Sequence, residues 1–432
     1  MSIPNIELKS LSEQRVLQNQ KLSDLLLYAG SNSPHYKKLF HERNISPEKI
    51  KTLEDLKHLP FTEKEDLQLH NDDFFCVDKS KIIDYVTSSG TLGEPIIIGL
   101  TESDLKRLEY NEYLSLVCAN GSSADIYQII TTLDRRFMAG LAYYMGVRRM
   151  GAGAIRVGSG IPELQWDTIR KIKPSALITV PSFMLPMIRF AKQHGIDVNT
   201  SGINKAICIG EPIRNPDFSL SVLAEKILNE WNVELYSTYA STEMQTAFTE
   251  CNQFNGGHHH PELLVVEVLD EGGNQVRNGE SGEVVITTLG VEGVPLLRYK
   301  TGDVCHYFSD PCKCGRHTIR LGPVIGRKKQ MIKYKGTTLY PQAFFDILGR
   351  FDDISNYVVV ASTNATGTDE IKILAASKKT DLEFEKELID HIKAKLRVAP
   401  KLEFTSNDKI EALQNKNSLG RKVARFIDER VA

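Results

Sequence analysis

The chain has 432 residues, 41% hydrophobic and 25% charged, a balance that is ordinary for globular proteins and a length that predicts two or three domains. Lys and Arg total 53 against 55 acidic residues, so a net charge of −2 offers no basic field to nucleic acid. The N-terminal residues lack the apolar core of a secretory signal, and no window approaches the roughly 18 uninterrupted apolar residues of a membrane span. We therefore expect a cytoplasmic protein without nucleic-acid or membrane partners.

Helical spacing of apolar residues dominates the N-terminal region. Ser33 is suited to cap a helix and Pro34 to occupy its first turn. Helices are expected over 7–30, 34–40, 52–60, 61–67 and 101–117, and a strand over 82–86.

Short apolar strands then alternate with helices as far as residue 231. The expected strands are 126–131, 153–157, 176–180 and 206–209, and the expected helices are 139–149, 166–172, 182–194 and 219–231. This alternation predicts an α/β fold with a largely parallel sheet, whose ligands sit beyond the carboxyl ends of the strands.

The pattern changes twice in the C-terminal half. Strands expected over 263–269, 282–288 and 296–299 indicate antiparallel pairing or a small barrel. Beyond Gly326-Arg327, a smaller α/β unit is expected, with strands over 354–361, 370–375 and 402–405 and a helix over 381–396. The predicted fold is thus a large N-terminal α/β domain, 1–328, with a barrel-like β-rich part at about 250–325, followed by a small α/β domain, 329–432.

The segment Thr87-Ser-Ser-Gly-Thr-Leu-Gly-Glu-Pro95 is rich in hydrogen-bond donors and poor in bulk. Glycines let backbone N–H groups approach an anion, and successive N–H groups form an anion-binding nest. The segment therefore predicts a loop that holds nucleotide phosphates, although it lacks the Gly-x-x-x-x-Gly-Lys-Ser/Thr pattern of a Walker A motif. A Ser/Thr/Gly turn with no phosphate role is the alternative.

Five further motifs follow in order: Ile209-Gly-Glu-Pro212, Leu235–Glu243, Leu297-Arg-Tyr-Lys-Thr-Gly-Asp303, Gly326–Gly336 and Asn417–Arg425. The third of these puts Asp303 directly after an expected tight Thr-Gly turn. With the loop, the set resembles the adenylate-forming enzymes: acyl-CoA synthetases, luciferases and non-ribosomal adenylation domains. The resemblance covers essentially the whole chain, and the runs 32–40, 56–67 and 86–95 are similar to the phenylacetate-CoA ligase branch.

The resemblance implies roles in ATP binding. Residues that would hold the β- and γ-phosphates are Ser88, Ser89, Gly90, Thr91 and Gly93. Further nucleotide contacts would come from Gly210, Glu211, Pro212, Tyr239, Ala240 and Ser241. Thr242 would bond the α-phosphate, and Glu243 would hold Mg²⁺. Asp303 would accept both ribose hydroxyls, with support from Arg327. From the residues alone, Glu243 could instead cap a helix and Asp303 could form an Asx turn.

The resemblance also implies functional roles for two lysines of the C-terminal domain. Lys422 matches the lysine that bridges the carboxylate and the α-phosphate, and Lys329 matches the hinge about which a mobile C-terminal domain rotates. Arg421 stands where the family usually has glycine, so Arg421 could take the lysine's role, or the segment could be a solvated basic helix. Glu94 stands where the family usually has lysine, which should weaken the attraction of the loop for triphosphate.

Cys312-Lys-Cys314 places two thiols within reach of one ion, and Cys251 with His258 would complete a tetrahedral zinc site. The branch and its relatives often show this arrangement, which implies structural zinc. Rival ligands are His259, His260, His306 and His317, and the histidine run at 258–260 could also be solvated without a metal. The other cysteines, Cys76, Cys118, Cys208 and Cys305, are expected in the core.

By family position, the acid pocket would be lined by Phe137, Tyr143, Tyr144, Ser182 and Ala240, although Tyr143 and Tyr144 could simply be helix packing. The resemblance implies an AMP-forming ligase that uses ATP, Mg²⁺ and CoA to convert phenylacetate or a close relative into its thioester, in a homodimer. Two alternatives are adenylation with a non-CoA acceptor, as in deazaflavin-adenylating or polysaccharide-linked relatives, and a non-catalytic nucleotide-binding regulator.

Overall fold

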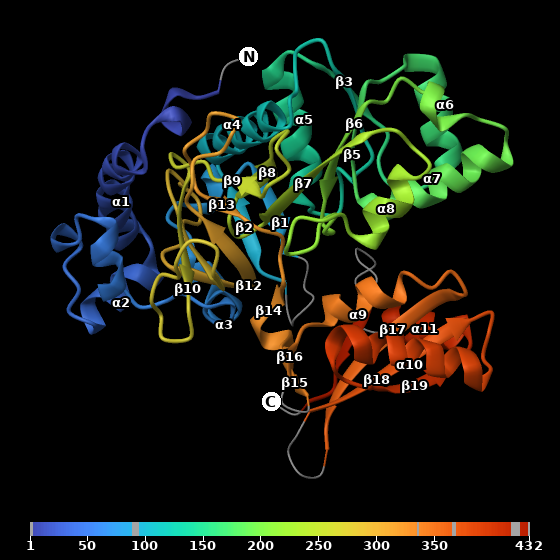
Figure 1. Ribbon diagram of the computed structural model, residues 1–432. Coiled ribbons are helices and arrows are strands. Elements are labelled where there is room, and N and C mark those ends of the chain that lie inside the picture. The colour runs from blue at the N-terminus through green and yellow to red at the C-terminus, as the bar shows by residue number, and fades with distance from the viewer. Residues whose placement is uncertain (1–2, 89–94, 335–336, 365–368, 416–423, 431–432) are drawn as a thin grey trace. The chain divides into compact units, whose positions relative to one another are not determined.

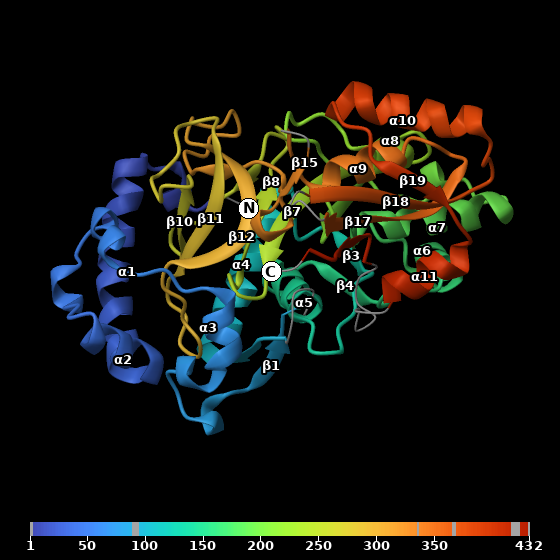
Figure 2. The same ribbon diagram turned by 90° about the horizontal axis from the view of Figure 1, so that it is seen from below.

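The computed structural model describes residues 3–88, 95–334, 337–364, 369–415 and 424–430, and Figures 1 and 2 show its course from two sides. The chain divides into two compact units. The first holds most of the chain up to Val324, and the second holds Gly302–Val304 and the chain from Ile325 onward. Within the described ranges, none of the helices combines the length and apolar character needed to cross a bilayer.

Among the described residues, one sheet of twelve strands runs in the order β10-β11-β12-β13-β9-β8-β7-β6-β5-β3-β4, with β14 paired to β12. The five strands β3 to β7 pair with one another in parallel. The pairs β7–β8, β8–β9, β9–β13, β13–β12 and β10–β11 are antiparallel. The strands are β3 (Ile126–Ile129), β4 (Gly153–Arg156), β5 (Ala176–Thr179), β6 (Lys205–Ile209), β7 (Glu234–Ser241), β8 (Thr246–Glu250), β9 (Gly257–His258), β10 (Leu264–Leu269), β11 (Ser281–Thr288), β12 (Tyr299–Phe308), β13 (Arg320–Leu321) and β14 (Gly326–Arg327).

Helices cover both faces of the parallel strands, as Figure 1 shows. Leu177, Ala206 and Leu235 belong to a core formed with α6, α7 and α8. The next residue of each strand points the other way, into a core formed with α4 and α5. The two-residue period of these strands therefore explains why both faces are apolar. The helices are α4 (Glu102–Cys118), α5 (Met138–Met150), α6 (Pro162–Ile172), α7 (Pro181–Gln193) and α8 (Val222–Leu228).

The N-terminal region forms a helical layer and a hairpin. Its elements are α1 (Leu11–Asn32), α2 (Pro34–Glu42), α3 (Lys64–Leu69), β1 (Asp84–Thr87) and β2 (Ile97–Leu100), joined by 3₁₀ turns, of which the longest is Leu53–His58. As predicted, the Ser33 side chain caps α2 and Pro34 begins it. Ser10 caps α1 through a capping box with Glu13, which is why the helix starts at Leu11 and not at residue 7.

The second unit is a four-stranded sheet in the order β19-β18-β17-β20. Residues Val359, Ile371 and Ile373 pack with α9 and α10 on one face, and Val358, Val360 and Leu374 pack with α11 on the other. Its elements are β15 (Ile332–Tyr334), β16 (Thr337–Leu339), α9 (Pro341–Leu348), β17 (Ile354–Thr363), β18 (Asp369–Ser377), α10 (Leu382–Leu396), β19 (Lys401–Phe404), α11 (Asn407–Asn415) and β20 (Phe426–Asp428).

The mixed α/β architecture is confirmed, and of the two arrangements considered for the β-rich region, antiparallel pairing is observed. One local prediction is wrong. The strand expected at 296–299 begins only at Tyr299 and continues to Phe308, so Asp303 lies within a strand and not after a tight turn. Gly302 has φ of +74° in that strand, which a glycine adopts without the penalty paid by other residues.

Candidate functional site

Thr242 and Glu243 lie in the turn that joins β7 to β8, half-buried at the carboxyl end of a parallel strand. The Met244 N–H donates to Ser241 Oγ at 3.2 Å, and the Gln245 N–H donates to Ser241 O at 3.3 Å. Ser241 thus closes the turn as well as ending the strand, and Tyr239 and Ala240 precede it in β7. The helix-cap interpretation of Glu243 is wrong, because β8 follows this turn where a helix was considered.

The segment Gly210-Glu211-Pro212 follows β6, the parallel neighbour of β7, so both motifs lie at one edge of the sheet. Gly210 has φ of +77° and is exposed. The Glu211 carboxylate accepts hydrogen bonds from the Ser182 N–H at 2.9 Å and from Ser182 Oγ at 3.0 Å. Glu211 therefore satisfies the amino end of α7, a role that sequence spacing alone does not indicate.

Asp303 and Arg327 are brought together in the second unit. They are register partners in the antiparallel pair β12–β14, and Arg327 Nε lies 3.4 Å from Asp303 Oδ1. Asp303 is the less exposed of the two, at 14% of its side chain against 36% for Arg327. A carboxylate beside a guanidinium still has lone pairs that accept hydrogen bonds, which suits a residue that accepts from hydroxyl groups.

Several predicted ATP residues are not covered by the structure: Ser89, Gly90, Thr91, Gly93, Arg421 and Lys422, with the discordant Glu94, lie outside the described residues. Ser88 is described. It is buried, and its hydroxyl accepts a hydrogen bond from the Ile96 N–H at 3.0 Å, so it joins the two sides of the loop base. Lys329 lies in a short 3₁₀ turn, where its carbonyl accepts from Arg430 at 3.1 Å.

The predicted acid-pocket residues differ in environment. Phe137 is half-buried at the amino end of α5, and Tyr143 is buried in the core between α5 and the sheet, where burial raises the pKa of its phenol. Tyr144 is half-buried under the guanidinium groups of Arg148 and Arg156. Ala240, near the end of β7, is exposed.

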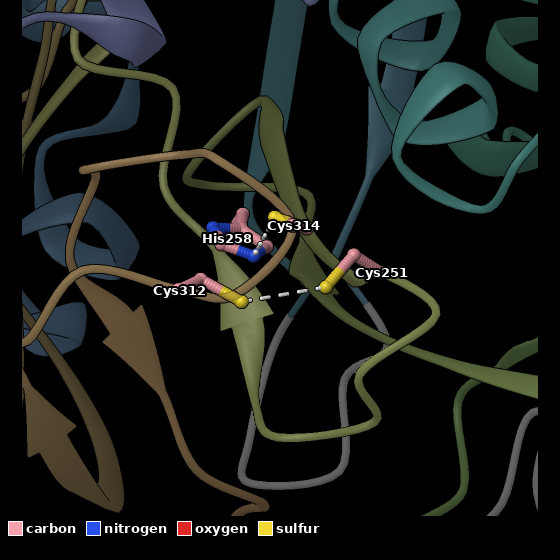
Figure 3. A group of neighbouring side chains, drawn as sticks. All are labelled: Cys251, His258, Cys312 and Cys314. Carbon is pink, nitrogen blue, oxygen red and sulfur yellow. Dashed lines mark hydrogen bonds between the residues drawn. The ribbon is translucent and has the colours of Figure 1, made fainter.

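Cys251, His258, Cys312 and Cys314 converge, as Figure 3 shows. Their potential ligand atoms all lie within 4.8 Å of one another, and all but Cys314 are buried. Cys251 Sγ is 3.7 Å from Cys312 Sγ, and Cys314 Sγ is 3.5 Å from His258 Nε2. Hydrogen bonds from the other two thiols hold the pKa of Cys314 well below its usual range, and burial lowers the pKa of His258. A thiolate beside a neutral imidazole is what a metal ion binds.

Outer contacts orient this cluster. The His258 Nδ1 atom lies 3.0 Å from Thr318 Oγ1, which leaves Nε2 directed at the thiols. Arg316 Nη1 lies 3.5 Å from Cys314 Sγ, while its Nε donates to Glu7. The predictions missed both residues, and only the position of Arg316 two residues after Cys314 could have hinted at it.

Three of the four rival histidines, His259, His260 and His306, have other partners for their side chains. His259 Nε2 is 2.6 Å from Leu264 O, His260 Nδ1 is 2.6 Å from Glu7 Oε1, and His306 Nδ1 is 3.1 Å from Gly279 O. The run at 258–260 is buried, so the solvated alternative is wrong. The four remaining cysteines are buried as predicted, but Cys118 packs against Cys251 and Cys312 rather than in the general core. A cavity of about 500 Å³ lies beside this cluster, lined by Cys251, Cys314 and Arg316 among others.

Comparisons with known proteins identify the family of this chain. Residues 34–292 match the family model described as AMP-binding enzyme. Phenylacetate-coenzyme A ligase of Thermus thermophilus is 27% identical over 369 residues, 84% of this chain and 81% of that protein, and the ligase of Escherichia coli is 26% identical over 387 residues, 87% and 85% of the two chains. Crystal structures of 2-hydroxyisobutyryl-CoA ligase in the postadenylation state share the fold, with a TM-score of 0.84 at 21% identity over 99% of this chain and 92% of that one. The chain belongs to the AMP-binding enzyme family, as its resemblance to the adenylate-forming enzymes predicted.

Proposed function

We propose that this protein activates an aryl carboxylic acid, phenylacetate or a close relative, with ATP and then transfers the acyl group to CoA. The observation that carries the proposal is that relatives named phenylacetate-coenzyme A ligase align with more than three quarters of the chain, at 26–28% identity, across the family match. The products are the acyl-CoA thioester, AMP and pyrophosphate.

The chemistry explains why the proposed residues are needed. In the first half-reaction, a carboxylate oxygen bonds to the α-phosphorus of ATP and pyrophosphate leaves. Both reactants are anions, so the protein has to neutralise charge and hold the nucleophile and leaving group in line. In the proposal, Thr242 bonds the α-phosphate and the backbone of the loop from Ser88 to Gly93 holds the β- and γ-phosphates. In the second half-reaction, the CoA sulfur attacks the acyl carbon and AMP leaves.

Asp303 and Lys422 complete the proposed nucleotide site. Asp303, held by Arg327, accepts the hydroxyl groups of the ribose and so fixes the nucleoside end of ATP. Lys422 places its ammonium between the carboxylate and the α-phosphate, where it offsets the repulsion of the two anions. Lys329 serves as the hinge that lets the C-terminal domain present different surfaces to the two half-reactions.

Two metal ions fit the residues that are present. Mg²⁺ would be held by Glu243, since a carboxylate beside Thr242 supplies the oxygen ligand that this hard ion requires, and the ion would neutralise phosphate charge. Zn²⁺ would be held by Cys251, His258, Cys312 and Cys314. Three sulfurs and one nitrogen fill a tetrahedral coordination sphere, so this ion would be structural and would take no part in the reaction.

A second candidate is adenylation with an acceptor other than CoA. It is favoured by the similarity of the chain to Protein CapK of Staphylococcus aureus, 21% identical over 406 residues, which is not named as a CoA ligase. A panel of carboxylic acids should be tested for ATP–pyrophosphate exchange, followed by CoA-dependent release of AMP. Exchange that persists while CoA has no effect would contradict the ligase and favour this candidate, whereas no exchange with any acid would contradict both.

A further inference from the structure

We propose that Arg107 is a positioning residue that fixes the turn carrying Thr242 and Glu243, an inference that rests on the proposed function. Arg107 is on α4 and is 8% exposed. Its side chain spans the space between that helix and the start of β8, where the turn ends. It is therefore placed to act on the reaction through the backbone and not by touching a substrate.

The guanidinium of Arg107 bonds three separate loop ends. Nη1 donates to Gln245 O at 2.7 Å, and Nη2 donates to Thr246 Oγ1 at 3.1 Å. Nη2 also donates to Leu263 O at 2.5 Å, and Nε donates to Leu289 O at 2.8 Å. Only the planar, five-donor fork of arginine can satisfy four such acceptors at once.

Arg107 is a buried cation whose four direct hydrogen-bond acceptors carry no charge. Burial lowers the pKa of Arg107 to about 10, although the Asp104 and Glu262 carboxylates raise it through space, so the buried cation persists at neutral pH. A buried charge without a bonded carboxylate is costly, and an apolar residue would avoid that cost. The hydrogen bonds of Arg107 instead fix the backbone conformation at Gln245 and Thr246.

The same helix holds the rest of β8. Asn111, one turn after Arg107, accepts the Ala247 N–H at 3.1 Å, and Cys118 Sγ donates to Thr249 O at 3.1 Å. Thr246 and Ala247 pair with Ser241 and Ala240 across the hairpin. The helix therefore fixes β8, and β8 fixes the end of β7 from which Thr242 and Glu243 project. Misplacing such groups by about 1 Å can cost about a hundredfold in rate.

The test compares Arg107→Met with Lys205→Met. Lys205 is also a buried cation, but it bonds Asn120 O and Asp125 at the amino end of β6, away from the turn. Hydrogen exchange of the backbone amides from 240 to 247 should accelerate at least about tenfold in Arg107→Met. It should stay unchanged in Lys205→Met. Arg107→Lys keeps the charge and part of the hydrogen bonding, so its amide exchange rates should lie between those of the wild-type protein and Arg107→Met. It replaces Arg107→Met in the test if that variant does not fold.

Kinetics supply the second readout. ATP–pyrophosphate exchange should fall in Arg107→Met by about tenfold to a hundredfold, whereas thioester formation from added acyl-adenylate should fall only a fewfold, because it needs no alignment of the triphosphate. The inference would be overturned if hydrogen exchange of the turn amides were the same in Arg107→Met and the wild-type protein. It would also be overturned if Arg107→Met lost the same factor in rate in both half-reactions. If none of the tested acids supports ATP–pyrophosphate exchange by the wild-type protein, the proposed function is contradicted instead. The hydrogen-exchange result would still decide the role of Arg107.

Discussion

Arg316 Nε donates to Glu7 Oε2 at 2.7 Å, and the other oxygen of Glu7 lies 2.6 Å from His260 Nδ1. Both side chains are almost fully buried, and the Glu7 carbonyl also accepts the His317 N–H. The N-terminal 3₁₀ turn, Asn5–Leu8, is therefore attached to the two segments that carry the Cys/His cluster. Burial raises the pKa of the Glu7 carboxyl, but the interactions with His260 and Arg316 together outweigh burial and hold this pKa below its usual value.

Metal removal should release this N-terminal turn. If zinc holds the loop of Cys312 and Cys314, Cys312→Ser or a chelator frees Arg316 from its position, and the buried contacts of Glu7 are lost. Trypsin cleavage after Lys9 should then accelerate at least about tenfold, because cleavage requires local opening. Cys305→Ser, which alters a buried cysteine away from the cluster, is the matched control.

Metal analysis completes this test. The wild-type protein and Cys305→Ser should each contain one zinc per chain, and Cys312→Ser should contain much less. The zinc proposal would be contradicted if the wild-type protein contained no stoichiometric zinc. An unchanged rate of trypsin cleavage after chelation would show that the metal does not hold the N-terminal turn in place.

Asp303→Ala should weaken ATP binding selectively. A hydrogen bond to a charged group contributes about 1.5–3 kcal/mol, so loss of the ribose contacts should raise the KM for ATP by about tenfold to more than a hundredfold. The KM for the acid should change little. Asp303→Asn keeps one acceptor oxygen, so its KM for ATP should lie between those of the wild-type protein and Asp303→Ala. Equal increases in both KM values would indicate a general disturbance of β12, where Asp303 pairs with Arg327.

Glu112 should make the stability of the protein depend on pH. It is 4% exposed on α4, and burial raises its pKa from the usual 4.5 to about 8. Below pH 4.5 the carboxyl is protonated in both the folded and unfolded states, so it adds no pH dependence. Between pH 4.5 and 8 only the unfolded state ionises, so stability falls with rising pH by up to about 1.4 kcal/mol per unit.

Glu112→Gln should remove this contribution. The free energy of unfolding in urea, measured from pH 5 to 8, should fall less steeply for Glu112→Gln than for the wild-type protein. Equal slopes would show that Glu112 is ionised in the folded state or that its pKa is near normal. Glu109→Gln, on the same helix but in a salt bridge with Arg149, controls for the loss of a carboxylate.

The sequence predicted the parallel strands and their helices well, because their apolar periods are strong and local. The prediction is wrong at Asp303, because the Thr301-Gly302 pair predicts a turn but lies within β12, where Gly302 adopts its positive φ and the strand pairs with β14. The sequence also did not predict the long-range contacts. The approach of Glu7 to Arg316 and the bonds from Arg107 to three loops depend on tertiary packing that no local spacing encodes.

Lys422→Ala should separate the two half-reactions. Removing the ammonium leaves the carboxylate and α-phosphate to repel each other, so ATP–pyrophosphate exchange should fall by about a hundredfold or more, in the range found for removal of a preorganised transition-state donor. Thioester formation from added acyl-adenylate should fall only a fewfold, since those two anions have already been joined. Arg421→Ala is the matched control, as it removes the neighbouring positive charge. If exchange falls instead in Arg421→Ala and persists in Lys422→Ala, the catalytic cation is Arg421; if it persists in both, neither residue neutralises the reacting anions.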